Sequence, residues 1–211
     1  AACLGIIGAR DNDFGMTGIV PEAELWFFPS ISFTGARLPE AFVGAYTILE
    51  RGDILSVSLG LGDRPLVYAA LEATLMTIGE SLGVTTFISA GNDANDLTDL
   101  ALPAVVDDAG SLPCVVVGAG FPAFRADTPT GGGTSTFVPF SRLGFSNHHF
   151  NLDPAVDSLE ALVHVQSWGI EVASLGYGDL FIPAGSTFDI FNRSYTAEFG
   201  GTSAACPLTA G

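Results

Sequence analysis

Residues 54–89 read ILSVSLGLGDRPLVYAALEATLMTIGESLGVTTFIS, and this stretch decides the fold class. Ile54–Leu59 is a short apolar run that predicts a buried strand. Leu66–Leu82 carries Ala, Leu, Glu and Met at helical spacing and predicts a helix that ends at Gly83. Val84–Ser89 predicts the next strand. A strand, a helix and a second strand with short connections imply a right-handed crossover between two parallel strands.

The same alternation extends to both sides of this unit. Leu25–Phe28 predicts a buried strand before it, and Leu38–Arg51 predicts a helix that stops at Gly52. Cys114–Val117 predicts one more strand after it. We therefore expect a three-layer α/β fold with a mainly parallel sheet between helices.

Ligands of such sheets bind beyond the carboxyl ends of the strands. The segments expected at those ends are Gly60–Pro65, Ala90–Asp99 and Gly118–Pro122. From about Gly120 to Pro154 the chain is rich in Gly, Thr, Ser and Pro, which predicts loops over the sheet.

The composition is that of a well-packed globular chain. Hydrophobic residues make up 48% of the 211 residues and charged residues 14%. No apolar run reaches the roughly 18 residues that a membrane span needs. The net charge is −16 and all seven basic residues are Arg. Because phosphate binding needs clustered cations, we expect no nucleic acid partner and no membrane partner. The acidic excess fits solubility, and we expect a monomer.

The three cysteines, Cys3, Cys114 and Cys206, cannot all pair with one another. Each lies in an apolar context, so we interpret them as small buried core residues. A disulfide between two of them is the alternative.

The strongest local signal is residues 199–207, Phe-Gly-Gly-Thr-Ser-Ala-Ala-Cys-Pro. Two glycines allow an unusual turn, and the small residues after them begin a helix, in whose early positions Pro207 is tolerated. Ser203 would then lie in the first helical turn, with an exposed hydroxyl, an unpaired N–H and a dipole that favours negative charge. Such a position suits a nucleophile that forms an anionic intermediate. The alternative is that Thr202 or Ser203 is an ordinary N-cap.

Four segments follow the order and plausible spacing of one known family. Gly201–Pro207 matches its nucleophile motif, Gly-Thr-Ser-x-Ala-x-Pro, at every fixed position. Ser89–Asn92 is similar to its oxyanion-hole segment, and Ser56–Gly60 is similar to its substrate-binding strand. Ala2–Pro21 is similar to the helix and loop that follow its catalytic histidine. On these residues the chain resembles the subtilases, the subtilisin-like serine peptidases, over essentially its whole length, with only a loose match across 121–154.

The resemblance implies roles for particular residues. Ser203 corresponds to the nucleophile. Asn92 corresponds to the residue whose side-chain amide binds the oxyanion together with the Ser203 N–H; the alternative is a plain turn residue. Two backbone segments would line the pocket for the side chain before the cut and pair with an extended peptide or protein substrate: Ser58, Leu59 and Gly60, with Ser89, Ala90 and Gly91.

One departure from the family pattern concerns the catalytic base. Family order is Asp, His, Ser, and the motif His-Gly-Thr would come immediately before Ala2, so both the His and the Asp would precede Ala1. We therefore interpret residues 1–211 as a partial catalytic domain, truncated at both ends, that is inactive on its own. His148, His149 and His164 are interpreted as structural residues rather than as substitutes for the base.

We expect the parent protein to be a secreted, extracellular serine endopeptidase that works by acyl transfer. A non-catalytic subtilase-like domain that binds peptides is the alternative. An unrelated doubly wound nucleotide-binding protein is a further alternative, against which no Gly-x-Gly-x-x-Gly follows the early strands. No cofactor is expected for catalysis. The loop Asp11–Gly15 is a candidate for structural Ca²⁺, although a solvated turn is the interpretation we favour.

Overall fold

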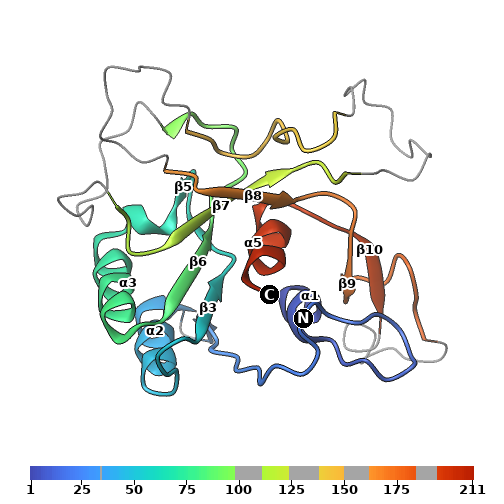
Figure 1. Cartoon of the computed structure of the whole chain (residues 1–211), viewed down its shortest axis with the longest axis horizontal. Helices are drawn as coiled ribbons and strands as arrows, with labels where there is room; N and C mark the ends of the chain where they lie inside the picture. The colour runs from blue at the N-terminus through green and yellow to red at the C-terminus, as the bar shows by residue number, and fades with distance from the viewer. Residues whose placement is uncertain (34, 98–110, 124–137, 150–161, 184–193) are drawn as a thin grey trace.

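Four parallel strands form the central sheet, in the order β3-β6-β7-β8. They are β3 (Ile54–Val57), β6 (Thr85–Ser89), β7 (Val115–Gly120) and β8 (Val165–Trp168). The computed structural model describes residues 1–33, 35–97, 111–123, 138–149, 162–183 and 194–211. Figure 1 shows helices on both sides of the sheet, so the predicted three-layer α/β fold with a parallel sheet is confirmed.

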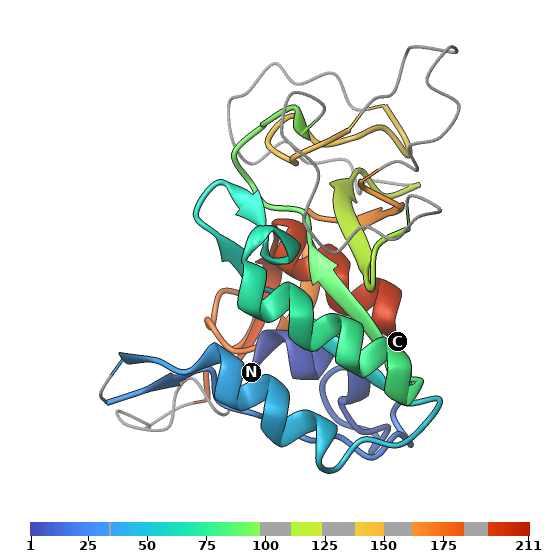
Figure 2. The ribbon, with the colours of Figure 1, turned by 90° about the vertical axis from the view of Figure 1, so that its left-hand side faces the viewer.

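Two helices cover one face of the sheet. They are α2 (Leu38–Tyr46) and α3 (Ala70–Leu82), which pack against each other and lie in front in Figure 2. The core on this side is aliphatic and aromatic; its fully buried members include Phe42, Met76, Ile88 and Val116. The predicted stop of α3 is confirmed, because Gly83 takes the left-handed conformation at φ 84°.

A short helix, α5 (Thr202–Ala210), crosses the other face and contacts all four strands. Ala204, Ala205 and Cys206 are 0% exposed, and their small side chains allow the helix to approach the sheet closely. The helix α1 (Ala2–Gly8) lies beside it (Figure 1). The amino end of α5 lies at the end of the sheet where the strands have their carboxyl ends, near residues that follow β3 and β6.

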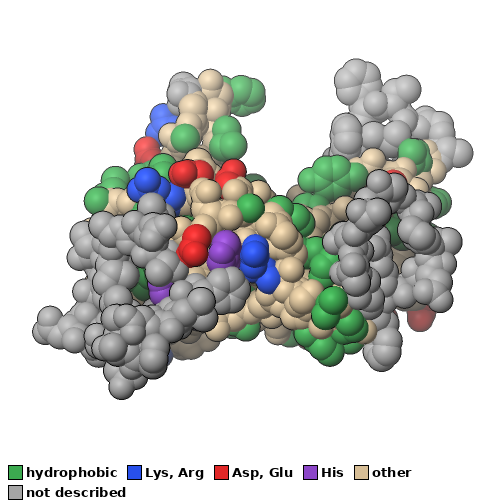
Figure 3. All heavy atoms as spheres, turned by 90° about the horizontal axis from the view of Figure 1, so that it is seen from above, with side chains coloured by type: hydrophobic (Ala, Val, Ile, Leu, Met, Phe, Trp, Pro, Cys, Tyr) green, Lys and Arg blue, Asp and Glu red, His purple; other side chains and the backbone are tan. Residues whose placement is uncertain are grey.

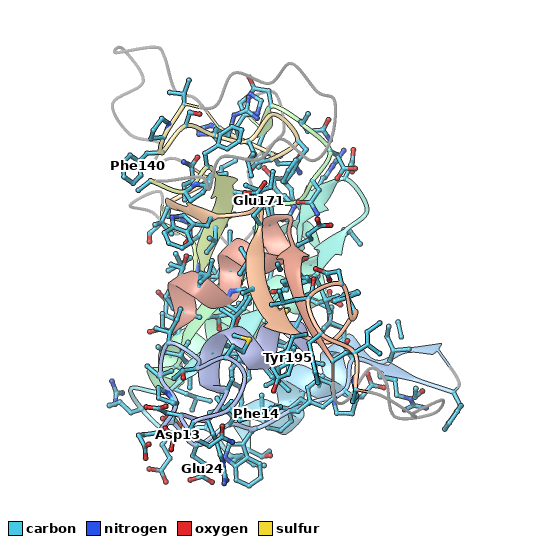
Figure 4. All side chains as sticks on the ribbon, turned by 90° about the vertical axis from the view of Figure 1, so that its right-hand side faces the viewer. Asp13, Phe14, Glu24, Phe140, Glu171 and Tyr195 are labelled. Atoms are coloured by element: carbon cyan, nitrogen blue, oxygen red, sulfur yellow. The ribbon has the colours of Figure 1, made fainter. Side chains whose placement is uncertain are left out.

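An antiparallel pair, β9 (Val172–Leu175) and β10 (Tyr195–Phe199), leads the chain into α5. An aromatic cluster ties this pair to the loop after α1. The Phe14 ring lies 6.2 Å from the Tyr195 ring, as Figure 4 shows, and 6.4 Å from the Phe181 ring. Helix α1, β9 and β10 thus form one packed unit beside α5.

Two small antiparallel hairpins complete the described structure. One joins β1 (Ile31–Ser32) to β2 (Gly35–Ala36) and projects from the body in Figure 2. The other joins β4 (Gly60–Leu61) to β5 (Arg64–Pro65), directly after β3, and is followed by a 3₁₀ turn, η1 (Leu66–Tyr68). No helix in the described ranges is both long and apolar enough to cross a bilayer.

The prediction of a buried strand at Leu25–Phe28 was wrong. This run is not in a strand, and Trp26 and Phe27 are 52% and 71% exposed. A strand needs a ladder partner on at least one side, and no described strand lies beside this run.

The predicted helices also differ in their bounds. Helix α2 ends at Tyr46 instead of Arg51, and the Thr47 hydroxyl there donates to the Gly44 carbonyl at 2.7 Å, which competes with helical continuation. The predicted helix 66–82 is interrupted at Ala69, whose backbone is extended.

Candidate active site

The amino end of α5 is built on Gly201. Its φ of 85° and ψ of 175° lie in a region that only glycine occupies readily. The next backbone N–H, that of Thr202, donates to the Asn92 side-chain oxygen Oδ1 at 2.8 Å. The helix start is therefore capped from outside, by a side chain from the loop after β6 (Thr85–Ser89).

The orientation of the Asn92 amide follows from this contact. Its Oδ1 accepts hydrogen bonds from the Thr202 N–H and, at 3.0 Å, from the Thr202 hydroxyl. Two donors on one atom identify that atom as the oxygen and leave Nδ2 on the other side of the amide. Within the described part of the chain, Nδ2 makes no hydrogen bond. The Asn92 amide therefore presents two N–H donors to solvent.

Ser203 lies next to this amide and is half-buried. Neither its hydroxyl Oγ nor its N–H has a hydrogen-bond partner among the described residues. The N–H belongs to the first turn of α5, where the dipole favours negative charge. The predicted Ser203 thus directly follows the residue that bonds the predicted Asn92, and both keep polar groups available.

The carbonyl of Ser203 has an unusual partner. Pro207 lies inside α5, so the prediction that it occupies an early helix position was wrong. Since proline lacks an N–H, the Ser203 carbonyl loses its helical donor four residues on. It accepts instead from the Ser58 hydroxyl at 3.0 Å and from the Cys3 thiol at 3.6 Å. Ser58 therefore joins the end of β3 to the backbone of Ser203.

The two predicted backbone segments flank this point. They follow neighbouring parallel strands and are joined by the Ser89 hydroxyl, which donates to the Leu59 carbonyl at 3.2 Å. The Gly91 N–H donates to the Thr202 hydroxyl at 3.2 Å. We call Ser58, Asn92, Thr202 and Ser203 the nucleophile rim, after the role that the sequence analysis predicts for Ser203. Every predicted site residue lies on the rim or in the segments 58–60 and 89–91 beside it, with Ser89 and Ala90 buried and Leu59 and Gly60 exposed.

A cavity of about 770 Å³ runs along the unpaired edge of β3. It extends from Ala1 past the strand to Ser58 and Leu59 at the nucleophile rim. The exposed run Leu25–Phe28 lines its other side, so the cavity separates this run from the sheet.

The three histidines lie elsewhere, around a pocket of about 210 Å³ that also contains Arg142. The His164 atom Nδ1 accepts from the Val116 N–H at 3.0 Å, and His149 Nδ1 accepts from the Leu162 N–H at 3.3 Å. We call this the histidine pocket.

His148 completes the histidine pocket, with its Nε2 3.8 Å from the Asp96 carboxylate. Figure 3 shows histidine between acidic and basic side chains on this surface. Burial lowers the pKa of His149, with smaller effects from Asp96 and His148. No described histidine bonds the Ser203 hydroxyl.

The cysteines of the chain are free thiols in the structure. Cys114 and Cys206 are buried, as predicted, and Cys3 is half-buried. Burial raises the pKa of the Cys114 thiol to about 12 and that of Cys206 to about 11. Burial therefore favours the neutral form of both thiols at physiological pH, and the neutral thiol is a weaker nucleophile than the thiolate.

The calcium hypothesis stays a prediction. Loop 11–15 is exposed, and Asp13 has a φ of 60°. In the described ranges no three carboxylate, imidazole or thiol groups converge as metal ligands. The hypothesis invokes other ligands, an Asn side chain and backbone carbonyls.

Sequence analysis did not identify the residue that organises the Asn92 loop. Asn147 is fully buried, and its side-chain amide reaches Ala90, Asp93 and Asn95. A local pattern cannot reveal it, because these three partners lie 52 to 57 positions away in the sequence.

A curated relative and a solved structure are similar to this chain. The "Minor extracellular protease Epr" of Bacillus subtilis (strain 168) is 30% identical over 94 residues, which are 43% of this chain and 14% of that protein. The chain thus spans a small part of that relative. A solved structure, "PatG macrocyclase in complex with peptide", is 15% identical with a TM-score of 0.43, over 82% of this chain and 38% of that one.

The sequence model described as "Subtilase family" matches residues 1–211, which is the whole chain. With the parallel sheet, the motif order and the nucleophile rim in agreement, the chain belongs to the subtilase family.

Proposed function

We propose that the protein containing this chain is a serine endopeptidase that cleaves peptide bonds by acyl transfer, with Ser203 as the nucleophile. The Ser203 Oγ attacks the carbonyl carbon, a base takes its proton, and the carbonyl oxygen becomes an oxyanion. The intermediate collapses to an acyl-enzyme while the amine leaves with that proton, and water then releases the acid. The observation that carries the proposal is the adjacency of Ser203 and Asn92 through Thr202.

The oxyanion would be held by the Asn92 Nδ2 and the Ser203 N–H. Two findings support this assignment. Thr202 fixes the Asn92 oxygen, so the amide N–H groups have a defined direction. The Ser203 N–H belongs to the first turn of α5 and has no described partner, so its donor is available without breaking another bond.

An extended peptide would bind between segments 58–60 and 89–91. These segments follow the carboxyl ends of β3 and β6, the edge at which parallel sheets bind ligands. Backbone pairing would supply affinity without demanding a particular side chain. A peptide or protein substrate fits this site better than a compact small molecule.

We place the general base and its carboxylate partner in polypeptide outside the 211 residues. The described histidines support this, because their ring atoms contact Val116, Leu162 and Asp96 rather than Ser203. The cavity of about 770 Å³ that reaches the nucleophile rim leaves room for such a segment. On this proposal the chain alone does not hydrolyse peptides, because a serine hydroxyl is a weak nucleophile without a base.

A non-catalytic peptide-binding domain is the second candidate. One observation favours it: no described side chain is hydrogen-bonded to Ser203 Oγ as a base. The two candidates share the site and differ only in whether a base is supplied.

Labelling with a fluorophosphonate separates the two candidates. We expect rapid labelling of the full-length protein at Ser203, located by mass spectrometry, and no labelling of Ser203→Ala. The 211-residue chain alone should label slowly or not at all. A full-length protein that binds peptides but neither labels nor cleaves would establish the binding domain; rapid labelling of the short chain would show that it already contains a base.

We further propose that the parent protein is secreted and monomeric. The acidic excess of −16 charges fits solubility outside the cell, and the name of the Bacillus subtilis relative describes an extracellular protease. Loop 11–15 remains our candidate for a structural calcium ion.

A further inference from the structure

Asn147 uses the full hydrogen-bonding capacity of its side chain. It is 0% exposed. Its Nδ2 donates to the Asp63 carbonyl at 2.8 Å and to the Ala90 carbonyl at 2.9 Å. Its Oδ1 accepts from the Asn95 N–H at 2.9 Å and from the Asp93 N–H at 3.1 Å. A primary amide has two donors and two acceptor sites, so no capacity of this buried group is left unmet.

The partners of Asn147 bracket Asn92 in the sequence. Ala90 precedes it, and Asp93 and Asn95 follow it. The backbone N–H of Asn147 also donates to the Gly91 carbonyl at 3.0 Å. The loop thus has hydrogen bonds to one buried residue on both sides of Asn92.

Apolar burial does little to define the shape of this loop, which depends on hydrogen bonds: those to Asn147, and others such as the bond from the Ala94 N–H to the Phe145 carbonyl at 2.7 Å. Asn92, Asp93 and Ala94 are exposed, so they bury little apolar surface. Gly91 and Ala94 have φ values of 101° and 59°, which regular strand or helix pairing does not stabilise. The fit to Asn147 is also close, because a Cβ on Gly91 would lie 2.4 Å from the Asn147 Nδ2.

Asn147 also connects the two sides of the proposed peptide site. Asp63 lies in the turn between β4 and β5, which continues segment 58–60, and Ala90 belongs to segment 89–91. One amide donates to both, while each keeps a further hydrogen bond: the Asp63 carbonyl accepts from the Asn95 Nδ2 at 3.2 Å, and the Ala90 N–H donates to the Val117 carbonyl at 2.9 Å.

We propose that Asn147 is a positioning residue that holds Asn92 in the geometry needed to bind the oxyanion, an inference that rests on the proposed function. Oxyanion donors must lie about 2.7–3.1 Å from the charge that develops. A displacement of about 1 Å at such a group costs on the order of 100-fold in rate. None of the described hydrogen bonds of Asn147 reaches Ser203, so we expect its effect on the rate to pass through the loop that carries Asn92.

The test uses Asn147→Asp in the full-length protein. The variant keeps the shape and the Oδ1 acceptor but replaces Nδ2, which carries both N–H donors, with one oxygen that faces the Asp63 and Ala90 carbonyls. We expect kcat to fall about 10- to 100-fold with KM changed by less than about threefold, because oxyanion binding occurs only in the transition state.

A double-mutant cycle with Asn92→Ala shows whether the two residues act together. If Asn147 acts through Asn92, the double variant is no slower than Asn92→Ala alone. Losses that multiply, or an unchanged kcat in Asn147→Asp, would overturn the inference and leave the proposed function standing. An Asn92→Ala variant of normal activity would instead refute the proposed oxyanion site, and the inference with it.

A matched control separates positioning from stability. Tyr46→Phe removes a half-buried hydrogen bond, 3.3 Å from the Tyr46 hydroxyl to Thr86, at the other end of the sheet. It should lower the melting temperature without changing kcat. An equal loss of kcat in this control would attribute the Asn147 effect to destabilisation and overturn the inference.

Two further measurements apply if the buried carboxylate prevents folding. Asn147→Ser is smaller and uncharged, and its kcat is interpreted in the same way. In the unmodified protein, hydrogen exchange reports the network directly: the amides of Asp93 and Asn95 should be protected although residue 93 is exposed. Exchange at unprotected rates would contradict the inference.

Discussion

The nucleophile rim and the histidine pocket both gather residue types that catalysis uses, but they use their polar groups in opposite ways. At the rim, the Ser203 hydroxyl and N–H and the Asn92 Nδ2 have no partner among the described residues. In the pocket, ring nitrogens of His149 and His164 bond backbone N–H groups. A reactive site needs accessible groups that are held in position yet left unpaired, and residue type alone does not provide them.

The same difference holds for the surrounding structure. The rim lies at the end of two parallel strands and the start of a helix. The first backbone N–H groups of a helix have no acceptor within the helix. The histidine pocket is lined by residues of β7 and β8. There the Val116 N–H, in β7, donates to the ring of His164, which directly precedes β8, instead of to a backbone carbonyl. Variants in the two regions should therefore have different consequences.

The largest effect is expected for Asn92→Ala in the full-length protein. We expect kcat to fall about 100- to 1000-fold with little change in KM, a range that was itself measured on an enzyme of this family. Steady-state hydrolysis of a peptide amide measures it. An equal fall in kcat in His164→Gln, a variant of the histidine pocket, would contradict the difference we propose between the two regions.

A smaller effect is expected for Gly201→Ala. The backbone there has a φ of 85°, and the new Cβ would lie 3.1 Å from the Asn92 Nδ2. We expect a loss of about 1–3 kcal/mol in unfolding free energy and lower activity, measured by urea unfolding and peptide hydrolysis. Gly52→Ala is the control: its φ is also positive, at 97°, but nothing lies within 4 Å. It should lose stability and keep activity, and equal activity losses would contradict the crowding argument.

Ser58→Ala tests how the Ser203 carbonyl is satisfied. Removal of the hydroxyl should cost about 1 kcal/mol in unfolding free energy, because a partly buried acceptor loses its main donor. Adding Pro207→Ala restores a backbone N–H for the same carbonyl and should recover part of that loss. Purely additive effects in thermal unfolding would show that Ser58 and Pro207 are not linked through this group.

The smallest effects are expected in the histidine pocket. His149→Gln should leave kcat unchanged but alter the pH dependence of stability. The pKa of His149 is below its ordinary value of 6.5 because burial disfavours the charged ring. The unfolded chain then binds the proton more readily, so stability falls as pH drops below about 6.5. Unfolding between pH 7 and pH 5 should be less pH-dependent in the variant, and an unchanged slope would contradict the assignment.

The sequence was informative where the signal was local. The spacing of residues 54–89 predicted β3, α3 and β6, and the glycine pair before Thr202 predicted the start of α5. Each of these depends on apolar periodicity or on one turn that only glycine allows. The positions of Asn92 and Ser203 came from the family resemblance, and their adjacency was a hypothesis until the contact through Thr202 was visible.

The sequence was uninformative where partners are distant. Leu25–Phe28 has the composition of a strand but no neighbour to pair with in the described structure. Asn147 looks like any polar residue in a loop, and only the folded chain brings it to Ala90 and Asp63. Pro207 was placed in the right helix, but the need for Ser58 to replace its donor depends on a contact across 145 positions.

A crystal structure of the full-length protein with a peptidyl boronate tests the central claim most directly. The boron should be bonded to Ser203 Oγ, with one boronate oxygen about 2.7–3.1 Å from both the Asn92 Nδ2 and the Ser203 N–H. The peptide should lie extended between segments 58–60 and 89–91. A boronate oxygen directed away from Asn92, or a boron bonded to another side chain, would contradict the account.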